Sequence, residues 1–321
     1  MALPWREGRV VSVGECMVEL ARGSDERFGL GYGGDTFNTA VYLARAGLEV
    51  AYATALGDDP YSAGITATAQ RERVATDLIV TVPGRLPGLY LIETTEGERS
   101  FWYWRDTAPA RELFELPNSD RIVAAIGQAS IVYFSGVTLS LYSERGLDRF
   151  EAALLAAKAN GARIAMDSNY RPRGWRGNID RARRTFERFW RLSDICMPTF
   201  DDEQVLWGDV DAEATVRRLL SLGVGEIAVK LGADGARVAG AGYQQHVPAQ
   251  CKVQAVDSTA AGDSFNAGYL AARMSGAPSA EAAAVGNCLA AVVIQHRGAI
   301  VPAEATAAVL ASKLDLKRQS G

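Results

Sequence analysis

The stretch that decides the fold reads Asp257-Ser258-Thr259-Ala260-Ala261-Gly262-Asp263-Ser264-Phe265-Asn266-Ala267-Gly268. An apolar extended run ends at Val256 before it, and apolar residues recur at helical spacing from Phe265 onward. This pattern predicts a strand, a tight turn and a helix whose first turn holds residues 260–263. Small side chains leave the backbone N–H groups of that turn exposed, and the helix dipole makes it a site for an anion.

Asp263 brings a carboxylate to this helix start, where a bound anion would repel it. The side chain could simply stabilise the first turn, because acidic residues are favourable there. It could instead act as a general base that takes a proton from a hydroxyl group while the adjacent amides hold a phosphoryl group. The residues alone leave both interpretations open.

Length and composition limit the class of protein. The chain has 321 residues, of which 48% are hydrophobic, so it can bury one large core or two modest ones. A net charge of −4 gives no sign of a nucleic-acid or membrane partner. Neither a signal-peptide core nor a membrane-spanning apolar segment is evident, so we expect a cytoplasmic protein.

Cysteine and histidine are sparse. The four cysteines (Cys16, Cys196, Cys251 and Cys288) are widely separated and form no CxxC pair. We therefore expect reduced, buried cysteines rather than a disulfide framework or a metal cage. Only two histidines are present, which argues against a histidine-based catalytic triad or metal site.

Strand patterns alternate with helical patterns along most of the chain. Strand-like apolar runs lie at residues 10–13, 50–54, 131–134, 163–166, 195–197 and 227–230. Such alternation predicts an α/β fold with a mostly parallel sheet. Because no linker, repeat or low-complexity tract interrupts it, we expect residues 1–321 to form a single domain.

The run Gly29-Leu30-Gly31-Tyr32-Gly33-Gly34 matches the dinucleotide-binding pattern G-x-G-x-x-G. A charged loop precedes it where the pattern requires a strand, so an NAD-dependent dehydrogenase is a weak alternative. A better interpretation is that the last two glycines let the backbone pass close to a ligand. Asp35 or Thr36 would then cap a helix over residues 37–46.

Residues 85–105 break the α/β alternation. Two extended runs around Glu96-Gly97 predict a hairpin in which Tyr90 lies opposite Tyr103. Alternation gives both faces aromatic residues, with Phe101, Tyr103 and Arg105 on one face and Trp102 and Trp104 on the other. The hairpin could cover a substrate on one face and protein or a second subunit on the other, or simply pack on its own core.

Three polar segments follow strand ends, where open parallel sheets bind ligands. Asp167-Ser168-Asn169-Tyr170-Arg171-Pro172 must be a loop because of its proline, although Arg171 could merely pair with surface carboxylates. Asp202 and Glu203 lie at an acidic helix start. The glycines of Gly232-Ala233-Asp234-Gly235 fit a turn with positive φ, which explains them without any ligand.

Two motifs carry a resemblance to a known family. They are Thr259-Ala260-Ala261-Gly262-Asp263-Ser264-Phe265 and Gly33-Gly34-Asp35-Thr36-Phe37-Asn38-Thr39-Ala40. Both closely resemble signatures of the ribokinase-like (PfkB-type) carbohydrate kinases, and the resemblance covers nearly the whole chain. It implies a three-layer α/β/α sandwich with a central, mostly parallel sheet and a small β-sheet lid from about residues 15–34 and 85–107. It also implies that Asp263 is the catalytic base and that the backbone of Ala260, Ala261 and Gly262 holds the anion.

The resemblance further implies ATP as phosphoryl donor, together with Mg²⁺. The implied nucleotide contacts are Ser168, Lys230, Gly232, Ala233, Gly235, Gly262 and Asn287. The family's Asn-x-x-Glu motif, which organises magnesium and phosphate, is matched here by Thr199 and Asp202 with Glu203 adjacent. Either acid could therefore serve, through water, and the resemblance leaves open whether K⁺ assists.

The substrate implied is a sugar acid. Within the family, Tyr103-Trp104-Arg105 and Asn169-Tyr170-Arg171-Pro172-Arg173 resemble members that act on keto-deoxy sugar acids, in which Gly34, Tyr90, Tyr103, Arg105 and Arg171 are the matching contacts. Arginine suits this role because its planar fork matches a carboxylate. A kinase of a neutral sugar, such as a fructokinase, shares every catalytic feature and remains an alternative, and a non-catalytic sugar sensor would lack the base. The resemblance also implies a homo-oligomer that assembles through the lid.

Overall fold

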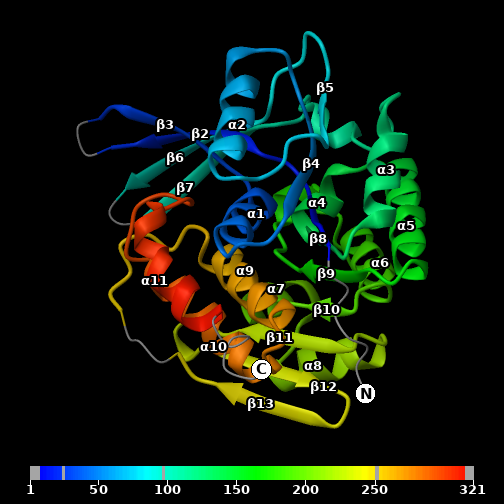
Figure 1. The fold of residues 1–321 in the computed structure, drawn as a ribbon, viewed down its shortest axis with the longest axis vertical. Helices are drawn as coiled ribbons and strands as arrows, with labels where there is room; N and C mark the ends of the chain where they lie inside the picture. The colour runs from blue at the N-terminus through cyan, green and yellow to red at the C-terminus, as the bar shows by residue number, and fades with distance from the viewer. Residues whose placement is uncertain (1–7, 24–25, 96–97, 250–252, 315–321) are drawn as a thin grey trace.

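The computed structural model describes residues 8–23, 26–95, 98–249 and 253–314. Nine strands form the large sheet: β1 (Val10–Val13), β4 (Val50–Leu56), β5 (Ile79–Thr81), β8 (Ile131–Ser135), β9 (Arg163–Asp167), β10 (Ile195–Cys196), β11 (Glu226–Lys230), β12 (Ala236–Gly240) and β13 (Tyr243–Val247). Their order is β13-β12-β11-β10-β9-β8-β1-β4-β5 (Figure 1). Only the β11–β12 and β12–β13 pairings are antiparallel, so the mostly parallel sheet is confirmed.

Helices connect these strands. The α-helices are α1 (Asp35–Arg45), α2 (Pro60–Arg71), α3 (Ser119–Gln128), α4 (Gly136–Leu141), α5 (Glu144–Ala159), α6 (Ile179–Trp190), α7 (Phe200–Trp207), α8 (Ala212–Ser221), α9 (Ala261–Met274), α10 (Ser279–Val293) and α11 (Ala303–Leu314). Short 3₁₀ helices are η1 (Pro109–Glu112), η2 (Pro172–Trp175) and η3 (Gly232–Asp234). Helical structure directly follows β4, β8, β9 and β10, as crossovers between parallel strands require, whereas β1 and β5 each lead first into a pair of strands outside the large sheet.

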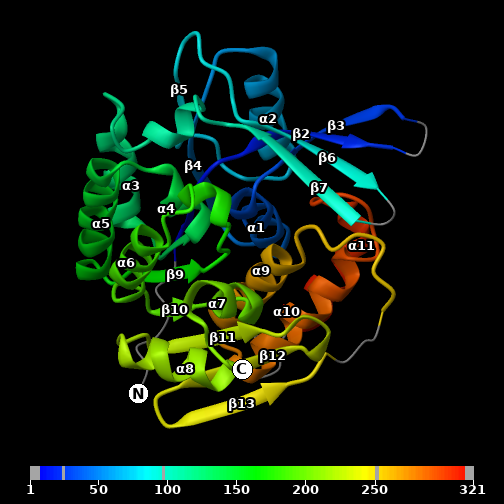
Figure 2. The ribbon, with the colours of Figure 1, turned by 180° about the vertical axis from the view of Figure 1, so that it is seen from behind.

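The helices cover both faces of the large sheet. Val11 of β1 packs in one apolar core with Phe186 of α6 and with residues of α3, α5 and α8. Its neighbour Val10 packs in a second core with Tyr269 of α9 and with residues of α1, α2 and α10. Successive strand residues point to opposite faces, so both must be apolar in a sheet covered on both sides. Figures 1 and 2 show this arrangement from opposite sides, and the predicted three-layer α/β/α sandwich is confirmed.

Four further strands form a small sheet that projects from the large one (Figures 1 and 2). They are β2 (Met17–Arg22), β3 (Phe28–Gly33), β6 (Leu89–Thr95) and β7 (Glu98–Trp104), in the order β3-β2-β6-β7. Tyr90 pairs with Tyr103 as predicted, while the turn residues Glu96 and Gly97 lie outside the described residues. Parallel pairing of β2 with β6 joins the two hairpins into one sheet.

The glycine-rich run does not form a dinucleotide-binding turn. Gly29 and Gly31 lie within β3, which pairs with β2 in antiparallel fashion, so they do not join a parallel strand to a helix. The predicted cap of α1 is wrong, because Gly34 is the N-cap and no side chain caps it. Asp35 is already helical, and its carboxylate accepts a hydrogen bond from the loop after β9.

The segment before α9 is not the predicted strand. The described residues 253–260 have no strand pairing, and the Val256 side chain is 58% exposed. The Val256 N–H donates to the carbonyl of Ile294, just after α10, at 2.8 Å. The apolar run was misleading because this backbone bonds to a helix end instead of a neighbouring strand.

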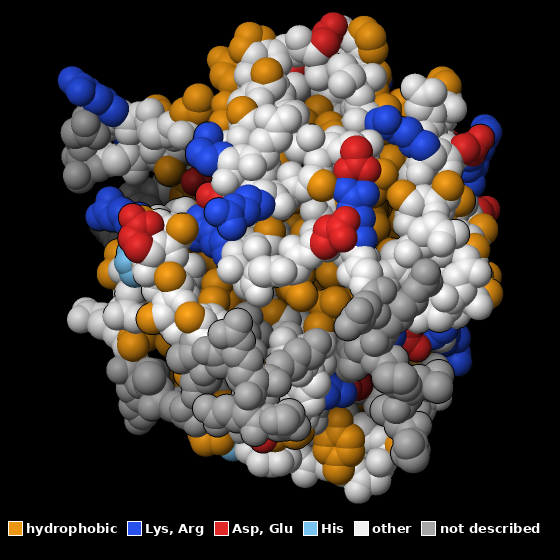
Figure 3. All heavy atoms as spheres, viewed as in Figure 1, with side chains coloured by type: hydrophobic (Ala, Val, Ile, Leu, Met, Phe, Trp, Pro, Cys, Tyr) orange, Lys and Arg blue, Asp and Glu red, His pale blue; other side chains and the backbone are white. Residues whose placement is uncertain are grey.

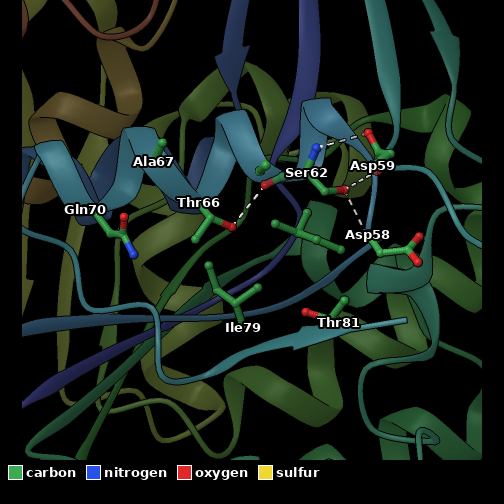
Figure 4. A pocket seen from close by; sticks show the side chains of 11 residues that line it. Asp58, Asp59, Ser62, Thr66, Ala67, Gln70, Ile79 and Thr81 are labelled. Atoms are coloured by element: carbon green, nitrogen blue, oxygen red, sulfur yellow. Dashed lines mark hydrogen bonds between the residues drawn. The ribbon is translucent and has the colours of Figure 1, made fainter. Parts of the chain in front are cut away.

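The surface is mixed in charge, and Figure 3 shows basic and acidic side chains interspersed on the face it draws. Along the described ranges, no helix combines the length and apolarity needed to cross a membrane. A cavity of about 300 Å³ lies between α2 and β5, where Ser62, Thr66 and Gln70 face Ile79 and Thr81 (Figure 4). None of the predicted site residues lines this cavity.

Candidate active site

The turn that starts α9 is held firmly by its surroundings. Its N-cap, Ala260, has a φ of 61°, in the left-handed region that residues with a Cβ rarely adopt. One oxygen of Asp257 accepts from the Thr259 N–H and the other from the Gly298 N–H, both at 2.8 Å. The Ala261 amide already donates to a carbonyl within the turn, at 3.2 Å. The backbone predicted to hold an anion is therefore fixed by the Asp257 carboxylate.

Asp263 lies in the first turn of α9 and is 9% exposed. Its Oδ2 accepts a hydrogen bond from Nδ2 of Asn38 at 2.8 Å, and its carbonyl accepts one from Oγ1 of Thr39 at 3.2 Å. Burial raises the pKa of Asp263 to about 7, with a further rise from the nearby Asp35 carboxylate, while the Asn38 bond opposes both. A carboxyl group that exchanges its proton near neutral pH suits general-base chemistry.

Lys230 ends β11 and lies beneath the first turn of α9. Its Nζ donates to Oδ2 of Asp167 at 2.8 Å and to Oδ1 of Asn266 at 3.0 Å. A Cβ built on Gly262 would lie 3.5 Å from this Nζ. Sequence reasoning assigned Lys230 to the nucleotide, whereas the structure buries it, 6% exposed, in an ion pair below the predicted anion-holding turn.

The predicted sugar contacts come together beside the small sheet. The rings of Tyr90 and Tyr103 are 6.0 Å apart, and the guanidinium of Arg105 lies 5.9 Å from the Tyr103 ring. Burial raises the pKa of Tyr103, whereas the positive charges of Arg105 and Arg171 lower it. Both arginines therefore lie near the Tyr103 ring. Gly34 lies next to this group: a Cβ on it would overlap the carbonyl oxygen of Glu15, and a Cβ on the preceding Gly33 would lie 2.7 Å from the Tyr90 hydroxyl.

Both predicted arginines already pair with carboxylates. Arg105 forms a short ion pair through Nη2 with Oε2 of Glu15, which is 3% exposed. Arg171 donates from Nη1 to Oδ1 of Asp202 at 3.0 Å, although 58% of the Arg171 side chain is exposed. Likewise, the Tyr90 hydroxyl donates to Glu19 in a short hydrogen bond. The region around Tyr90 and Tyr103 therefore contains charged side chains of both signs.

Two predicted nucleotide contacts, Gly235 and Asn287, meet at the end of β13, and Gly232 and Ala233 lie in the turn that leads to Gly235. Gly232 and Gly235 have φ values of 58° and 94°, which confirms the turn with positive φ. The Gly235 Cβ position is occupied by the carbonyl of Val247, and Nδ2 of Asn287 donates to the same carbonyl at 3.2 Å. Ala233, between the two glycines, is exposed. The structure therefore brings η3, the end of β13 and α10 together in one place.

The two acids proposed for magnesium differ in their surroundings. Both oxygens of Asp202 are engaged, by Arg171 and by the Tyr170 N–H, so it fits a metal contact only through water. Glu203 is fully buried and accepts from Arg218 at 2.7 Å, and burial raises its pKa to about 7. Among the described residues, no group of three or more metal-binding side chains occurs. A directly coordinated magnesium does not fit this donor set. The side chain of Ser168, a predicted nucleotide contact, is completely buried, as that of Glu203 is.

Comparison with known proteins decides the family. The model of the family described as pfkB family carbohydrate kinase matches residues 7–306. The chain belongs to the pfkB family. ATP is the phosphoryl donor used by pfkB kinases, and the predicted membership and enzyme class are confirmed.

Two curated relatives of this pfkB kinase are named 2-dehydro-3-deoxygluconokinase. The protein from Dickeya dadantii (strain 3937) is 42% identical over 305 residues, which cover 92% of the chain and 97% of the relative. The protein from Escherichia coli (strain K12) is 41% identical over 306 residues, covering 92% and 98%. A crystal structure of a putative ribokinase II from E. coli with ATP and Mg²⁺ superposes with a TM-score of 0.81 at 23% identity, covering 96% and 99%. This last similarity confirms the ribokinase-like fold.

Several residues of this pfkB kinase site were missed by sequence reasoning. Asn38 was quoted within a motif, but its bond to Asp263 joins residues that are 225 positions apart. Glu15, Glu19 and Asp167 were not assigned a role, although each carboxylate pairs with a predicted site residue. The only signal was position, because Asp167 ends a parallel strand and Glu15 closely follows one.

Proposed function

We propose that this kinase transfers the γ-phosphoryl group of ATP to the terminal hydroxyl of 2-keto-3-deoxygluconate, giving 2-keto-3-deoxy-6-phosphogluconate. The observation that carries the proposal is the 41–42% identity, over 92% of the chain, with two proteins named 2-dehydro-3-deoxygluconokinase. The arginines near Tyr103 support it, because a sugar acid brings a carboxylate that needs strong donors.

In the proposed mechanism, Asp263 takes the proton of the sugar hydroxyl as that oxygen attacks the γ-phosphorus. Its raised pKa supports this role, because a base poised near neutral pH can accept the proton and return it. Backbone amides at Ala260 and Gly262 would hold the oxygens of the transferring group at the start of α9, and the Ala261 amide would join them by releasing the Ser258 carbonyl. The ammonium of Lys230 beneath them adds a fixed positive charge to that end of the helix.

The nucleotide would lie over the second half of the large sheet. The proposed contacts are Gly232, Ala233, Gly235 and Asn287. The predicted contacts Lys230 and Ser168 are buried, so we propose that they support this region from below. Mg²⁺ would arrive bound to the phosphates of ATP and neutralise their charge, with Asp202 contacting it through water. Glu203 is fully buried and bonded to Arg218, which supports Asp202 rather than Glu203 as the acid that contacts magnesium.

The proposed contacts of the sugar acid are Tyr90, Tyr103, Arg105, Arg171 and Gly34. We propose that the small sheet is a lid on a single domain, and that its closure excludes water, which would otherwise accept the phosphoryl group.

A substrate panel tests the proposal. The rate of ADP release would be measured with 2-keto-3-deoxygluconate, 2-keto-3-deoxygalactonate, fructose and ribose, each with K⁺ or Na⁺ as the monovalent cation. We expect kcat/KM for the best keto-deoxy acid to exceed that for either neutral sugar by about 10²-fold or more. Phosphorus NMR of the product should show a phosphate on the terminal carbon. Equal values for acids and neutral sugars would refute the proposed substrate class.

A kinase of a neutral sugar is the second candidate, and one observation favours it. Both arginines proposed for the carboxylate already pair with acidic side chains, Glu15 and Asp202. The carboxylate of Glu19, bonded to Tyr90, could accept a sugar hydroxyl in such an enzyme. The same panel separates the two candidates, because fructose or ribose would then be the preferred acceptor.

We also propose that two copies of the chain meet through the outer face of the small sheet. Leu30, Trp102 and Trp104 are 55%, 51% and 60% exposed there, an unusual exposure for side chains of this size. A groove of about 700 Å³ lies alongside, lined in part by Val18 and Leu89, and it extends to Tyr103 and Arg105 at the edge of the sheet. A second copy would bring the same apolar face, as a two-fold interface requires.

Light scattering after gel filtration tests this assembly. We expect the native protein to have a mass of at least two chains of 34.4 kDa each, and Trp104→Glu to shift it toward the monomer. The matched control is Val210→Glu, because Val210 is 79% exposed outside the small sheet and should leave the mass unchanged. A native mass of one chain, or equal behaviour of both variants, would contradict the proposal.

A further inference from the structure

The ion pair between Glu15 and Arg105 joins the two sheets. Glu15 follows β1 of the large sheet, after one intervening glycine, and Arg105 directly follows β7 of the small sheet. Nη2 of Arg105 donates to Oε2 of Glu15, and the two side chains are only 17% and 2% exposed. A buried carboxylate on the large sheet therefore fixes the guanidinium at the base of the small sheet.

The surroundings leave Glu15 little freedom. A Cβ on Gly88, the residue before β6, would lie 2.7 Å from Oε1 of Glu15 and 3.1 Å from Cβ of Arg105. A Cβ on Gly34 would overlap the carbonyl oxygen of Glu15. Glu15 thus packs against Gly88, where the chain enters β6, against Arg105, where it leaves β7, and against Gly34. Because its backbone and its side chain are both confined, it can hold Arg105 in one orientation.

Charge and geometry both point to a ligand. Arg111 of η1 also acts on the Glu15 carboxylate, and burial holds the pKa of Arg111 below its ordinary value. Two cations, Arg105 and Arg111, therefore act on Glu15, and the Asp35 carboxylate acts on it in the opposite direction. Nε of Arg105 and Oε1 of Glu15 are buried without a hydrogen-bond partner, so only one edge of the guanidinium is engaged by Glu15.

We propose that Glu15 is a positioning residue, which orients Arg105 so that its free N–H groups meet the substrate carboxylate. The inference rests on the proposed function for the identity of that substrate. Glu15 itself would not contact the sugar acid, because its carboxylate is sealed from solvent behind Arg105 and Gly88. Its contribution would appear in substrate binding rather than in the chemical step.

A double-mutant cycle tests this role. Glu15→Leu removes the acceptor, Arg105→Met removes the guanidinium, and the double variant removes both. We expect Glu15→Leu to raise KM for the keto-deoxy acid about 10- to 100-fold, with kcat and the KM for ATP within about threefold. In the Arg105→Met background, the same change should alter KM less than about twofold, because no guanidinium is left to orient.

Glu15→Gln guards against simple misfolding, because it keeps one acceptor for Arg105 and should raise KM less than Glu15→Leu. The matched control is Glu72→Gln, which disrupts another largely buried ion pair, with Arg45 at 2.7 Å, away from the predicted site residues. It should lower the melting temperature and leave KM unchanged.

Two results would overturn the inference: an unchanged KM in Glu15→Leu, or an equal rise in KM with and without Arg105. If the wild type phosphorylates only neutral sugars, the proposed substrate class fails. The cycle would then be measured with the preferred sugar, and a lack of coupling between Glu15 and Arg105 would refute the positioning role separately.

Discussion

Replacing Asp263 with Asn would test the centre of the mechanism. The change removes the carboxylate but keeps the size of the side chain, and the amide oxygen can still accept the hydrogen bond from Asn38. General-base catalysis contributes about 10²–10⁴ to a rate, so we expect kcat to fall by this factor. The affinity for ATP should remain within about twofold, because the proposed nucleotide contacts are untouched.

The same substitution should stabilise the protein at high pH. Folding raises the pKa of Asp263 from its ordinary value of 3.8 to about 7, so between these values the folded chain keeps a proton that the unfolded chain has released. The stability of the wild type therefore falls as the pH rises through this window. A pKa difference of this size corresponds to about 4 kcal/mol, and the variant has no carboxylate to deprotonate. Its advantage over the wild type should vanish near pH 4 and be largest above pH 7.

Two measurements check these expectations. ADP release at saturating substrates gives kcat from pH 5 to pH 9, and wild-type turnover should rise through about pH 7 as Asp263 loses its proton. Urea unfolding at pH 5 and pH 8 gives the free energy of unfolding of both proteins. The matched control is Asp201→Asn, an exposed acid in the first turn of α7, which should change stability by less than about 1 kcal/mol and leave kcat unaltered.

Near-normal turnover of Asp263→Asn would remove this residue from the role of base. A stability difference that does not depend on pH would show that the carboxyl group titrates normally, and the link between its burial and its function would then fail.

Two further substitutions probe the groups around this base. Asn38→Ala removes the hydrogen bond that lowers the pKa of Asp263, so the rise of kcat with pH should move to higher pH; an unmoved profile would contradict this. Lys230→Met leaves Asp167 buried without its cation and should cost about 3–5 kcal/mol of unfolding free energy and at least about tenfold in kcat. Lys158→Met, which breaks a more exposed pair with Asp194, should cost less than about 1 kcal/mol and leave kcat intact.

Local patterns in the sequence were sufficient for the elements that carry the site. The small residues around Gly262 predicted the helix start of α9, and alternation around Tyr103 predicted which hairpin residues face each other. The paired glycines of η3 predicted a turn with positive φ. These features depend on near neighbours in the chain, so their physical cause can be read from a short window.

The partners of the charged residues could not be predicted in this way. Glu15 and Arg105 are 90 residues apart, and no local pattern specifies that they meet. Lys230 ends a strand whose burial was expected, yet its ion pair with Asp167 depends on the order of β9, β10 and β11 in the sheet. The predicted strand before Asp257 failed for the same reason, because its apolar composition does not show what the backbone will bond to.

The small sheet also constrains the order in which the protein assembles. Its two hairpins are held together by β2 and β6, and the contacting residues Glu19 and Tyr90 are separated by 71 positions in the chain. The intervening segment contains α1, β4, α2 and β5, and compaction of these elements shortens the loop that must close before the two hairpins can meet. During synthesis, the first hairpin emerges from the ribosome with an unpaired edge, which only the much later arrival of β6 can cover.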